Sequence, residues 1–333
     1  MEIFMDYFVE SYGSAGYVDF SSSNFTGLKK WYRLYDYPRS LTAALIDKIT
    51  EQAQKENCEF DLIHHCFDAL PKGVVVNGCG VLGMPFAEKD SFSAGNLLDR
   101  GGYEKAMEEV YACFSRAKKI HDEWEQIYIQ KTDFALLNRL AEQVSDKLIG
   151  NRYLPKTGTK KDRFFGSATV SGAKDYIAEL TENVEKRYFI KGRPGTGKST
   201  FLRKIAEYAL SRGFDTEIYH CAFDPASLDM ILSRELGLCL FDSTSPHEYF
   251  PSREKDEIID IYQIAVEPGT DEDNGEQIAL LSSSYQKEMK EATEHISEAK
   301  QCLDQADEKL LSLLDPILIE KTEQQILKGI FDS

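Results

Sequence analysis

The chain has 333 residues, of which 42% are hydrophobic and 11% aromatic. This length suits two domains or one large one, and the composition is that of a globular protein rather than a disordered one. Lys and Arg total 39 and Asp and Glu 56, giving a net charge of −17. That balance argues against nucleic acid as a partner, because non-specific affinity for it comes largely from cationic side chains meeting phosphates.

The spacing of the cysteines and the length of the apolar runs exclude further classes of protein. The 7 cysteines are scattered, and no Cys-x-x-Cys pair occurs. We therefore expect reduced thiols rather than a zinc ribbon or a disulfide framework. Residues 1–10 contain three acidic and no basic residues, and no apolar run approaches the roughly 20 residues that cross a bilayer. The sequence predicts a soluble, cytoplasmic protein without a signal peptide or a membrane partner.

Residues 8–68 match residues 164–224 at a constant offset of 156 positions, almost without gaps. The matched pairs include Phe8 and Phe164, Ser11 and Ser167, Lys30 and Lys186, Tyr32 and Tyr188, Pro38 and Pro194, Lys48 and Lys204, His64 and His220, and Asp68 and Asp224. A repeat of this kind indicates an internal duplication. We predict a first domain with a helical arm over 1–150, a linker over 151–162, and a second domain with a C-terminal helical arm over 163–333.

The two arms are predicted from helical periodicity. Residues 276–314 contain no Gly or Pro, and apolar side chains recur there at separations of seven or eight. Residues 103–149 have a similar pattern. Packing of the arms against each other or against their own domains is the simpler interpretation. The alternative is a lever or a surface that binds a protein partner in response to nucleotide.

A phosphate-binding loop is predicted between a strand and a helix in the second half. Residues 187–191 are typical of a short strand, and residues 199–212 place apolar side chains on one helical face. Gly213 follows, where a helix often ends in a left-handed residue. Residues 192–199 match G-x-x-x-x-G-K-[ST] in full.

Each residue type in this loop has a chemical role. Glycines let backbone N–H groups surround a phosphate, and the helix N-terminus adds its positive dipole end. Lys198 is expected to contact the β- and γ-phosphates, and Ser199 to ligate magnesium. The predicted nucleotide-binding residues are Gly192, Gly195, Thr196, Gly197, Lys198, Ser199 and Thr200. The expected ligand is a nucleoside triphosphate, taken as ATP, with Mg²⁺.

The elements after the loop suggest the rest of the site. Residues 215–221 predict a strand, residues 224–236 a loop and helix, and residues 236–241 an apolar strand that ends at Asp242. A carboxylate at such a strand end is placed to hold magnesium together with Ser199. The alternative is an ordinary turn aspartate.

Three further side chains are candidates for the part of the site where the γ-phosphate meets the water or substrate that attacks it. His247 is placed to approach the γ-phosphate, although a lone histidine is more often structural. Asp224 and Asp229 are candidates for lining the substrate side. No glutamate follows Asp242, so an attacking water has no obvious local base. The predicted catalytic residues are Lys198, Asp242 and His247.

The first half lacks the loop chemistry. At the same offset the three loop glycines become Asp36, Arg39 and Leu41, and the lysine and serine become Thr42 and Ala43. We expect no nucleotide binding of the P-loop kind here, and a structural or regulatory role instead.

Residues 163–168, residues 186–200 and the run Asp242-Ser-Thr-Ser-Pro-His247 together resemble a family of bacterial tandem P-loop ATPase-like proteins. The last run is similar to the family's Asp-Gly-Thr-x-Pro-His element. The resemblance covers nearly the whole chain, and it implies a P-loop fold and ATP binding. Members usually carry two intact loops, whereas the first loop here departs at every key position.

The sequence thus predicts an α/β protein made of two duplicated, three-layer P-loop NTPase-type domains with parallel sheets and long helical arms. The function expected first is a slow ATPase or a nucleotide-dependent switch. The alternative is a kinase that transfers the γ-phosphate of ATP to a small molecule.

Overall fold

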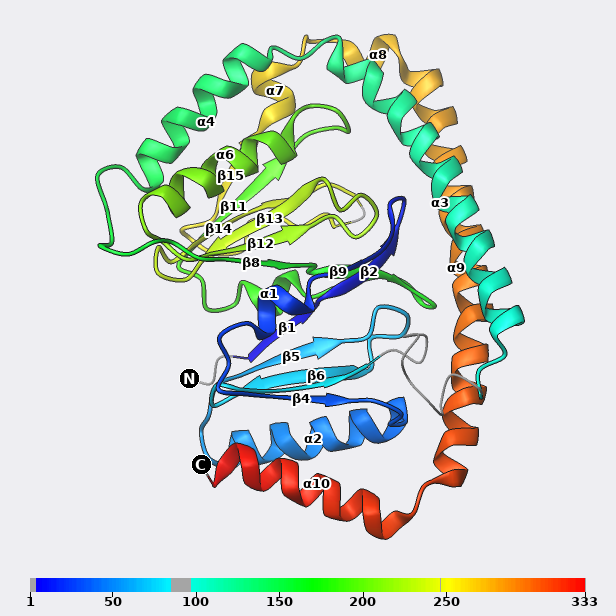
Figure 1. Cartoon of the computed structure of the whole chain (residues 1–333). Helices are drawn as coiled ribbons and strands as arrows, with labels where there is room; N and C mark the ends of the chain where they lie inside the picture. The colour runs from blue at the N-terminus through cyan, green and yellow to red at the C-terminus, as the bar shows by residue number, and fades with distance from the viewer. Residues whose placement is uncertain (1–3, 85–96, 246, 333) are drawn as a thin grey trace.

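The computed structural model describes residues 4–84, 97–245 and 247–332. It contains two β-sheets, one above the other in Figure 1, with a pair of long helices running along one side of both. Two short β-hairpins and two short helices lie between the sheets. No helix within the described residues is long and apolar enough to cross a membrane.

The second sheet carries the predicted phosphate-binding loop. Its strands, in spatial order, are β15 (Glu257–Asp260), β11 (Lys186–Lys191), β14 (Leu238–Asp242), β13 (Leu228–Ser233), β12 (Thr216–His220) and β8 (Lys160–Arg163). Neighbouring strands are parallel except for β13, which is antiparallel to β12 and to β14. The sheet is therefore mixed, and the prediction of parallel sheets is confirmed only in part.

The helix predicted within residues 224–236 is wrong, because residues 228–233 form the strand β13. Its six residues are nearly all buried, with Met230 facing the space between the sheets and Ile231 facing the outer helices. Alternation of side chains between two apolar faces is the strand period. A run this short does not distinguish strand from helix, and here burial on both faces favours the strand.

The first sheet has the same design. Its strands, in spatial order, are β1 (Phe4–Phe8), β5 (Phe60–His64), β6 (Pro71–Val76), β7 (Cys79–Gly83) and β4 (Lys30–Leu34), and only β6 is antiparallel to its neighbours. Phe4, Lys30 and Phe60 begin β1, β4 and β5, and the residues 156 positions later begin β8, β11 and β12. Apart from β15 at the edge of the second sheet, the described strands of the two sheets thus agree in order and direction, and these three pairs also agree in spacing along the chain.

Between the sheets lie the hairpins β2 (Glu10–Gly13) with β3 (Gly16–Asp19) and β9 (Gly166–Thr169) with β10 (Gly172–Asp175), and the helices α1 (Ser21–Phe25) and α5 (Ile177–Leu180). Phe8 and Phe164 exchange two backbone hydrogen bonds, each of 2.9 Å. Ser11 Oγ donates to Ala222 O and Ser167 Oγ donates to Cys66 O, both at 2.9 Å. Reciprocal contacts of this kind are typical of a two-fold related interface.

The outer faces of the sheets are covered by helices, and the halves exchange one helix each. The first sheet packs on α2 (Arg39–Lys55) and on α10 (Pro316–Phe331) from the C-terminal end, which contributes Ile326 and Ile330. The second sheet packs on α6 (Lys198–Ser211), α7 (Ile261–Ala265) and α4 (Phe134–Leu148), the last from the first half. The longer helices therefore cover the outer faces, while the hairpins and the short helices α1 and α5 lie between the sheets, and the predicted three-layer domains give way to two sheets that face each other.

The predicted arms are helical and pack against each other. The first consists of α3 (Arg100–Ile129) followed by α4, and the second of α8 (Thr270–Asp273), α9 (Gly275–Leu313) and α10. Figure 1 shows α3 and α9 side by side along both sheets. Residues such as Val110, Phe114, Ile296 and Leu303 form their shared core. The two arms thus pack against each other, as the simpler interpretation of their sequence pattern expects.

One buried cation ties the halves together. The side chain of Arg163, in β8, is 1% exposed and donates to Asp61 (3.1 Å) and to Glu217 (2.9 Å). Its guanidinium lies 3.8 Å from the centre of the Tyr7 ring. Burial raises the pKa of the Asp61 carboxyl, and the Arg163 charge opposes that rise. The ion pairs stabilise both carboxylates at the contact between the sheets.

Replacement of Arg163 by Met is expected to destabilise the protein by about 3–5 kcal/mol, because two buried carboxylates lose their cation. The measurement is the midpoint of urea unfolding followed by circular dichroism at pH 7. Lys255→Met is the control, since Lys255 pairs with Glu185 (2.6 Å) on the surface. That variant should keep the wild-type midpoint, and equal midpoints for both variants would contradict the role given to Arg163.

Candidate nucleotide-binding site

The predicted loop lies where β11 ends and α6 begins. Gly195 and Gly197 have φ of 76° and 86°, a left-handed conformation that glycine adopts without steric cost. Gly197 is the N-cap of α6, so the backbone N–H groups of the first turn face the loop. Gly213 follows α6 with φ of 85°, as predicted for the residue after the helix.

The same glycines are required by close contacts with the first arm. A Cβ on Gly195 would lie 2.5 Å from the carbonyl oxygen of Glu125 in α3. A Cβ on Gly197 would lie 2.7 Å from Leu137 in α4. The loop of the second half is thus covered by helices of the first half.

The charged and hydroxyl groups of the loop meet the end of the neighbouring strand β14. Lys198 Nζ donates to the carbonyl of Arg193 (2.9 Å) and lies 3.5 Å from Asp242 Oδ2. The other oxygen of Asp242 accepts hydrogen bonds from Thr244 N (3.1 Å) and Oγ1 (2.6 Å). The hydroxyl of Ser199 accepts from Leu228 N (2.9 Å) at the start of β13. The carboxylate of Asp242 therefore lies beside the lysine and hydroxyl of the loop, although it is distant from them in sequence.

These groups line one cavity of about 890 Å³, within the range of nucleotide and cofactor sites. All the predicted site residues line it: Gly192, Gly195, Thr196, Gly197, Lys198, Ser199, Thr200, Asp242 and His247. Asp224 and Asp229, the candidates for lining the substrate side, line it as well. Pro246, in the element that precedes His247, lies outside the described residues.

Asp229 occupies a position that the sequence did not reveal. Met230 pairs with Phe241 across β13 and β14, so Asp229 and Asp242 are the next residues of the two strands and face each other. Burial and the charge of Asp242 raise the pKa of Asp229 to about 6. The sequence missed this pairing because residues 224–236 were assigned to a loop and helix, which placed no strand beside Asp242.

The donor groups fit a magnesium ion. Mg²⁺ prefers oxygen ligands, and the cavity wall next to the loop presents the Ser199 hydroxyl and the carboxylates of Asp242 and Asp229. Lys198 supplies a cation on the same side. Such a set suits the charges of a bound triphosphate and its metal.

The imidazole of His247 is held in position by the carboxylate of Asp175. Its Nδ1 lies 2.7 Å from Asp175 Oδ2, at the end of β10. Burial lowers the pKa of His247, but the hydrogen bond to Asp175 and the nearby acidic groups outweigh it, so the pKa is raised. The contact with Asp175 therefore favours the protonated form of His247.

Both arms contribute to the cavity. Arg193 of the loop donates to Asp271 in α8 (2.8 Å), and Tyr128 OH of α3 donates to the same carboxylate (2.8 Å). Trp124 of α3 and Tyr285 of α9 line the cavity. Sequence reasoning missed these residues, since periodicity shows which face of an arm is apolar but not which loop that face covers.

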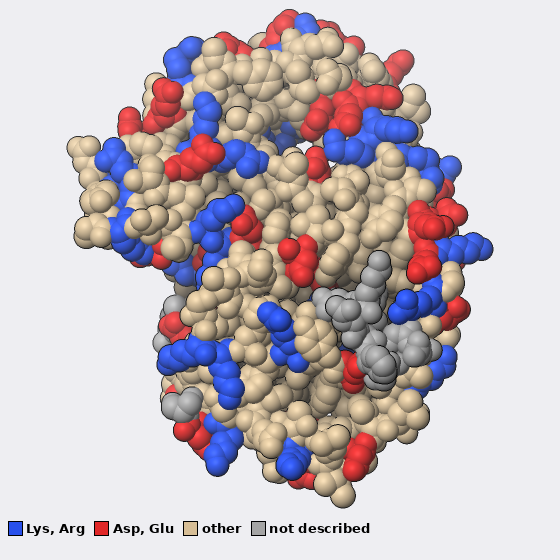
Figure 2. Space-filling view, viewed as in Figure 1, with Lys and Arg blue, Asp and Glu red and all other residues tan. Residues whose placement is uncertain are grey.

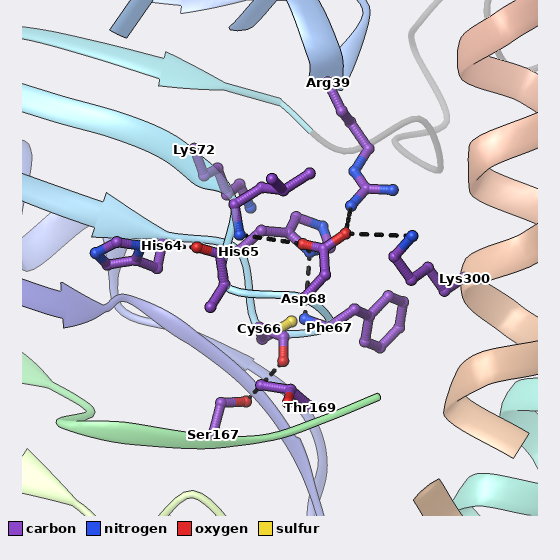
Figure 3. Close-up of polar contacts among 12 residues, drawn as sticks. Arg39, His64, His65, Cys66, Phe67, Asp68, Lys72, Ser167, Thr169 and Lys300 are labelled. Carbon is purple, nitrogen blue, oxygen red and sulfur yellow. Dashed lines mark hydrogen bonds and ion pairs between the residues drawn. The ribbon is translucent and has the colours of Figure 1, made fainter. Parts of the chain in front are cut away.

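At the position of the first half that corresponds to the phosphate-binding loop, protein side chains leave little space for a ligand. At the start of α2, Thr42 is 3% exposed and lines a cavity of only about 60 Å³. Arg39, Lys72 and His65 line the same cavity, and Figure 3 shows the contacts that surround them. A space of that size holds water molecules but not a nucleotide.

The distribution of charge on the surface is mixed. In the view of Figure 2, acidic and basic side chains alternate over the described residues rather than gathering into a basic strip. This face offers no extended cationic track of the kind that follows a nucleic acid backbone.

The position of Trp124 predicts a spectroscopic signal. The chain has two tryptophans, and Trp31 stacks on Phe25 away from the cavity. In a Trp31→Phe variant, ATP–Mg²⁺ is expected to change the emission of Trp124 in a saturable manner, because the ligand enters beside the indole. The control is Trp124→Phe, whose remaining emission should not respond. A response from Trp31 alone would place the ligand elsewhere.

Neither the curated proteins nor the solved structures that we compared gave a match to the chain. A family model does match: residues 175–332 correspond to the KAP family P-loop domain. The match begins at the end of β10 and includes the loop, α6, β14 and the second arm. Residues 175–332 therefore carry a KAP family P-loop NTPase domain, which implies binding of a nucleoside triphosphate with Mg²⁺.

Proposed function

We propose that this protein binds ATP–Mg²⁺ at residues 192–200 and acts as a slow ATPase or a nucleotide-dependent switch. The observation that carries the proposal is the shared cavity. Loop residues, α3 of the first arm and α9 of the second arm line it together. A triphosphate bound in this cavity therefore contacts the phosphate-binding loop and both arms at once.

The assigned roles follow from the geometry of the loop. The backbone N–H groups around Gly195 and Gly197 and the N-terminus of α6 bind the phosphates. Lys198 exchanges its contact with the Arg193 carbonyl for the β- and γ-phosphates. Ser199 and Asp242 hold Mg²⁺, which neutralises charge on the phosphates when bound.

The switch is supported by the link from the loop to the arms. Arg193 is one residue past the first loop glycine, and its guanidinium is held by Asp271. Asp271 also accepts from Tyr128, so one carboxylate joins the loop, α8 and α3. When a triphosphate fills the loop, its charge competes with Asp271 for Arg193. The arms then change their packing, and a protein partner that contacts them senses the nucleotide.

We further propose that the two halves arose by duplication and that the first has lost its nucleotide site. This is supported by equal strand order and by corresponding side-chain contacts. His64 bonds Asp6 (2.8 Å) and the carbonyl of Ala69, and His220 bonds Asp162 (2.9 Å) and the carbonyl of Pro225, each partner 156 positions later. The first half then acts as a structural companion.

Calorimetric titration with ATP–Mg²⁺ is expected to give one site per chain. Lys198→Ala should abolish that site or weaken it strongly, because the loop loses its cation for the β- and γ-phosphates. Thr42→Ala, at the equivalent position of the first half, is the matched control and should bind as the wild type does. Two sites per chain, or full binding by Lys198→Ala, would refute the proposed division between the halves.

We propose that Asp229 takes the place of the glutamate that is missing after Asp242. It accepts the proton of the water whose oxygen attacks the γ-phosphorus, while the bond to the β–γ bridging oxygen breaks and ADP leaves. Asp229→Asn is expected to lower single-turnover hydrolysis about 10²–10⁴-fold while ATP still binds. Asp224→Asn, which changes another carboxylate of the cavity, should hydrolyse near the wild-type rate. Normal hydrolysis by Asp229→Asn would remove it from the chemistry.

A kinase is the second candidate, favoured by the room beside the reacting carboxylates. Asp224, Asp229 and His247 line a cavity that also reaches the aromatic rings of Phe223 and Tyr285. An acceptor hydroxyl there would lose its proton to Asp229 in the same way as water. ADP formation that depends on an added small-molecule alcohol, rather than proceeding in buffer alone, would favour the kinase over the slow ATPase.

A further inference from the structure

Part of the wall of the nucleotide cavity is apolar and comes mainly from the first half of the chain. Trp124, Tyr128 and Ile129 of α3 and Phe134 at the start of α4 line it, together with Ile278 of α9. Phe134 is 39% exposed, and Trp124, Ile129 and Ile278 are only partly buried. A concave surface with aromatic and aliphatic side chains left partly exposed is typical of a site for the apolar part of a ligand.

These side chains lie over the backbone of the phosphate-binding loop. A Cβ on Gly197 would lie 3.2 Å from the Phe134 ring. Tyr128 OH donates to Asp271 (2.8 Å), the carboxylate that also binds the arginine of the loop. Trp124 is four residues before Tyr128 and therefore on the same face of α3. The apolar wall thus continues directly from the loop toward α4 and α8.

The turn between α3 and α4 is fixed against the second half. Asp133 N donates to Ala265 O (2.7 Å), and Glu267 N donates to Lys131 O (2.9 Å). The side chain of Asp133 caps α4 by accepting from Leu136 N (2.9 Å). These bonds also fix the aromatic residue that begins α4. A wall that is already ordered loses little conformational entropy when a ligand binds to it.

The apolar wall and the carboxylates of the cavity lie at different ends of it. Lys118 of α3 lies 3.7 Å from Asp224, in the loop that leads to β13 and to Asp229. Tyr128, ten residues and about 15 Å farther along the helix, lies at Asp271. The cavity therefore extends along α3 from a carboxylate end to an aromatic end, and Figure 1 shows that α3 approaches α4 and α8 at the latter.

The place of the triphosphate determines where the rest of the nucleotide lies. With Mg²⁺ held by Ser199 and Asp242, as proposed above, the γ-phosphate lies toward Asp229 at the carboxylate end. The nucleoside is at the opposite end of the triphosphate, so it extends along α3 toward Tyr128. A planar base there meets aromatic rings on which it can stack. The cavity volume of about 890 Å³ is large enough for both parts of the ligand.

We propose that Trp124, Tyr128 and Phe134 form the base-binding part of the nucleotide site and that the base is a purine, a proposal that rests on the proposed function. The two fused rings of a purine offer more area for stacking than the single ring of a pyrimidine. All three residues lie outside residues 175–332, which match the family model. The first half thus selects the nucleotide whose phosphates the second half binds.

Calorimetric titration of the full chain with ATP, CTP and inorganic triphosphate, each with Mg²⁺, separates recognition of the base from recognition of the phosphates. The wild type is expected to bind ATP more tightly than CTP. Trp124→Leu should weaken ATP binding about 5- to 150-fold, as expected for loss of one base–aromatic stack, and leave triphosphate binding unchanged. Trp124→Phe should restore most of the ATP affinity. Trp31→Leu is the matched control and should bind ATP as the wild type does, since Trp31 stacks on Phe25 away from the cavity.

Equal weakening of ATP and triphosphate by Trp124→Leu would overturn the proposal, because it would indicate a general effect on the loop. Equal affinities of the wild type for ATP and CTP would overturn it too, as would loss of the ATP preference in Tyr285→Leu rather than in Trp124→Leu. If Trp124→Leu does not fold, Phe134→Leu at its exposed position is used with the same criteria. A wild type that binds none of the three ligands refutes the proposed function, whereas triphosphate binding without preference for ATP over CTP refutes the base site alone.

Discussion

A β-sheet with an apolar outer face has to be covered, and in this protein each half supplies part of the cover for the other. α4 ends the first half and packs on the second sheet, and α10 ends the second half and packs on the first sheet. For these helices to reach their places, α3 and α9 must run along both sheets and therefore along each other. The long helical pair and the composite cavity both follow from this exchange.

The exchange also explains why the nucleotide cavity contains residues from both halves. α3 passes over the phosphate-binding loop so closely that Gly195 has no space for a side chain. The glycines thus serve two purposes: they allow the loop conformation and they admit the first arm. In a P-loop domain standing alone, only the first of these would apply.

Sequence reasoning succeeded where chemistry fixes the spacing of residues. The loop at 192–199 specifies its strand, its helix and its lysine, because each is needed to bind phosphate, and the helical arms follow from long uninterrupted periodicity. It failed where partners are chosen by tertiary packing. β13 is a six-residue apolar run whose period is ambiguous, so the pairing of Asp229 with Asp242 was hidden. Asp307 is one acid among many on a polar helix, and it is distinguished by its burial and by the hydrogen bonds it accepts from the backbone of Arg39 and Ser40 at the start of α2.

The resemblance between the halves has a further consequence for symmetry. Contacts such as Ser11 with Ala222 and Ser167 with Cys66 repeat in both directions, as they do between identical subunits. Positions at this contact are nevertheless free to differ, since both halves lie in one chain. Arg163 takes advantage of this freedom, because its counterpart 156 positions earlier is Tyr7, which packs against it. A true pair of identical subunits would have to bury two arginines there or none.

The packing of α10 on the first sheet affects how the chain folds during synthesis. Residues 316–331 leave the ribosome after every strand of both sheets, yet they complete the core of the sheet that is made first. Contacts such as those of Glu323 with Tyr37 and Lys48 close loops of more than 270 residues. Closing such long loops is slow compared with local folding. The first half therefore waits, with part of its outer face exposed to solvent, until the last helix arrives.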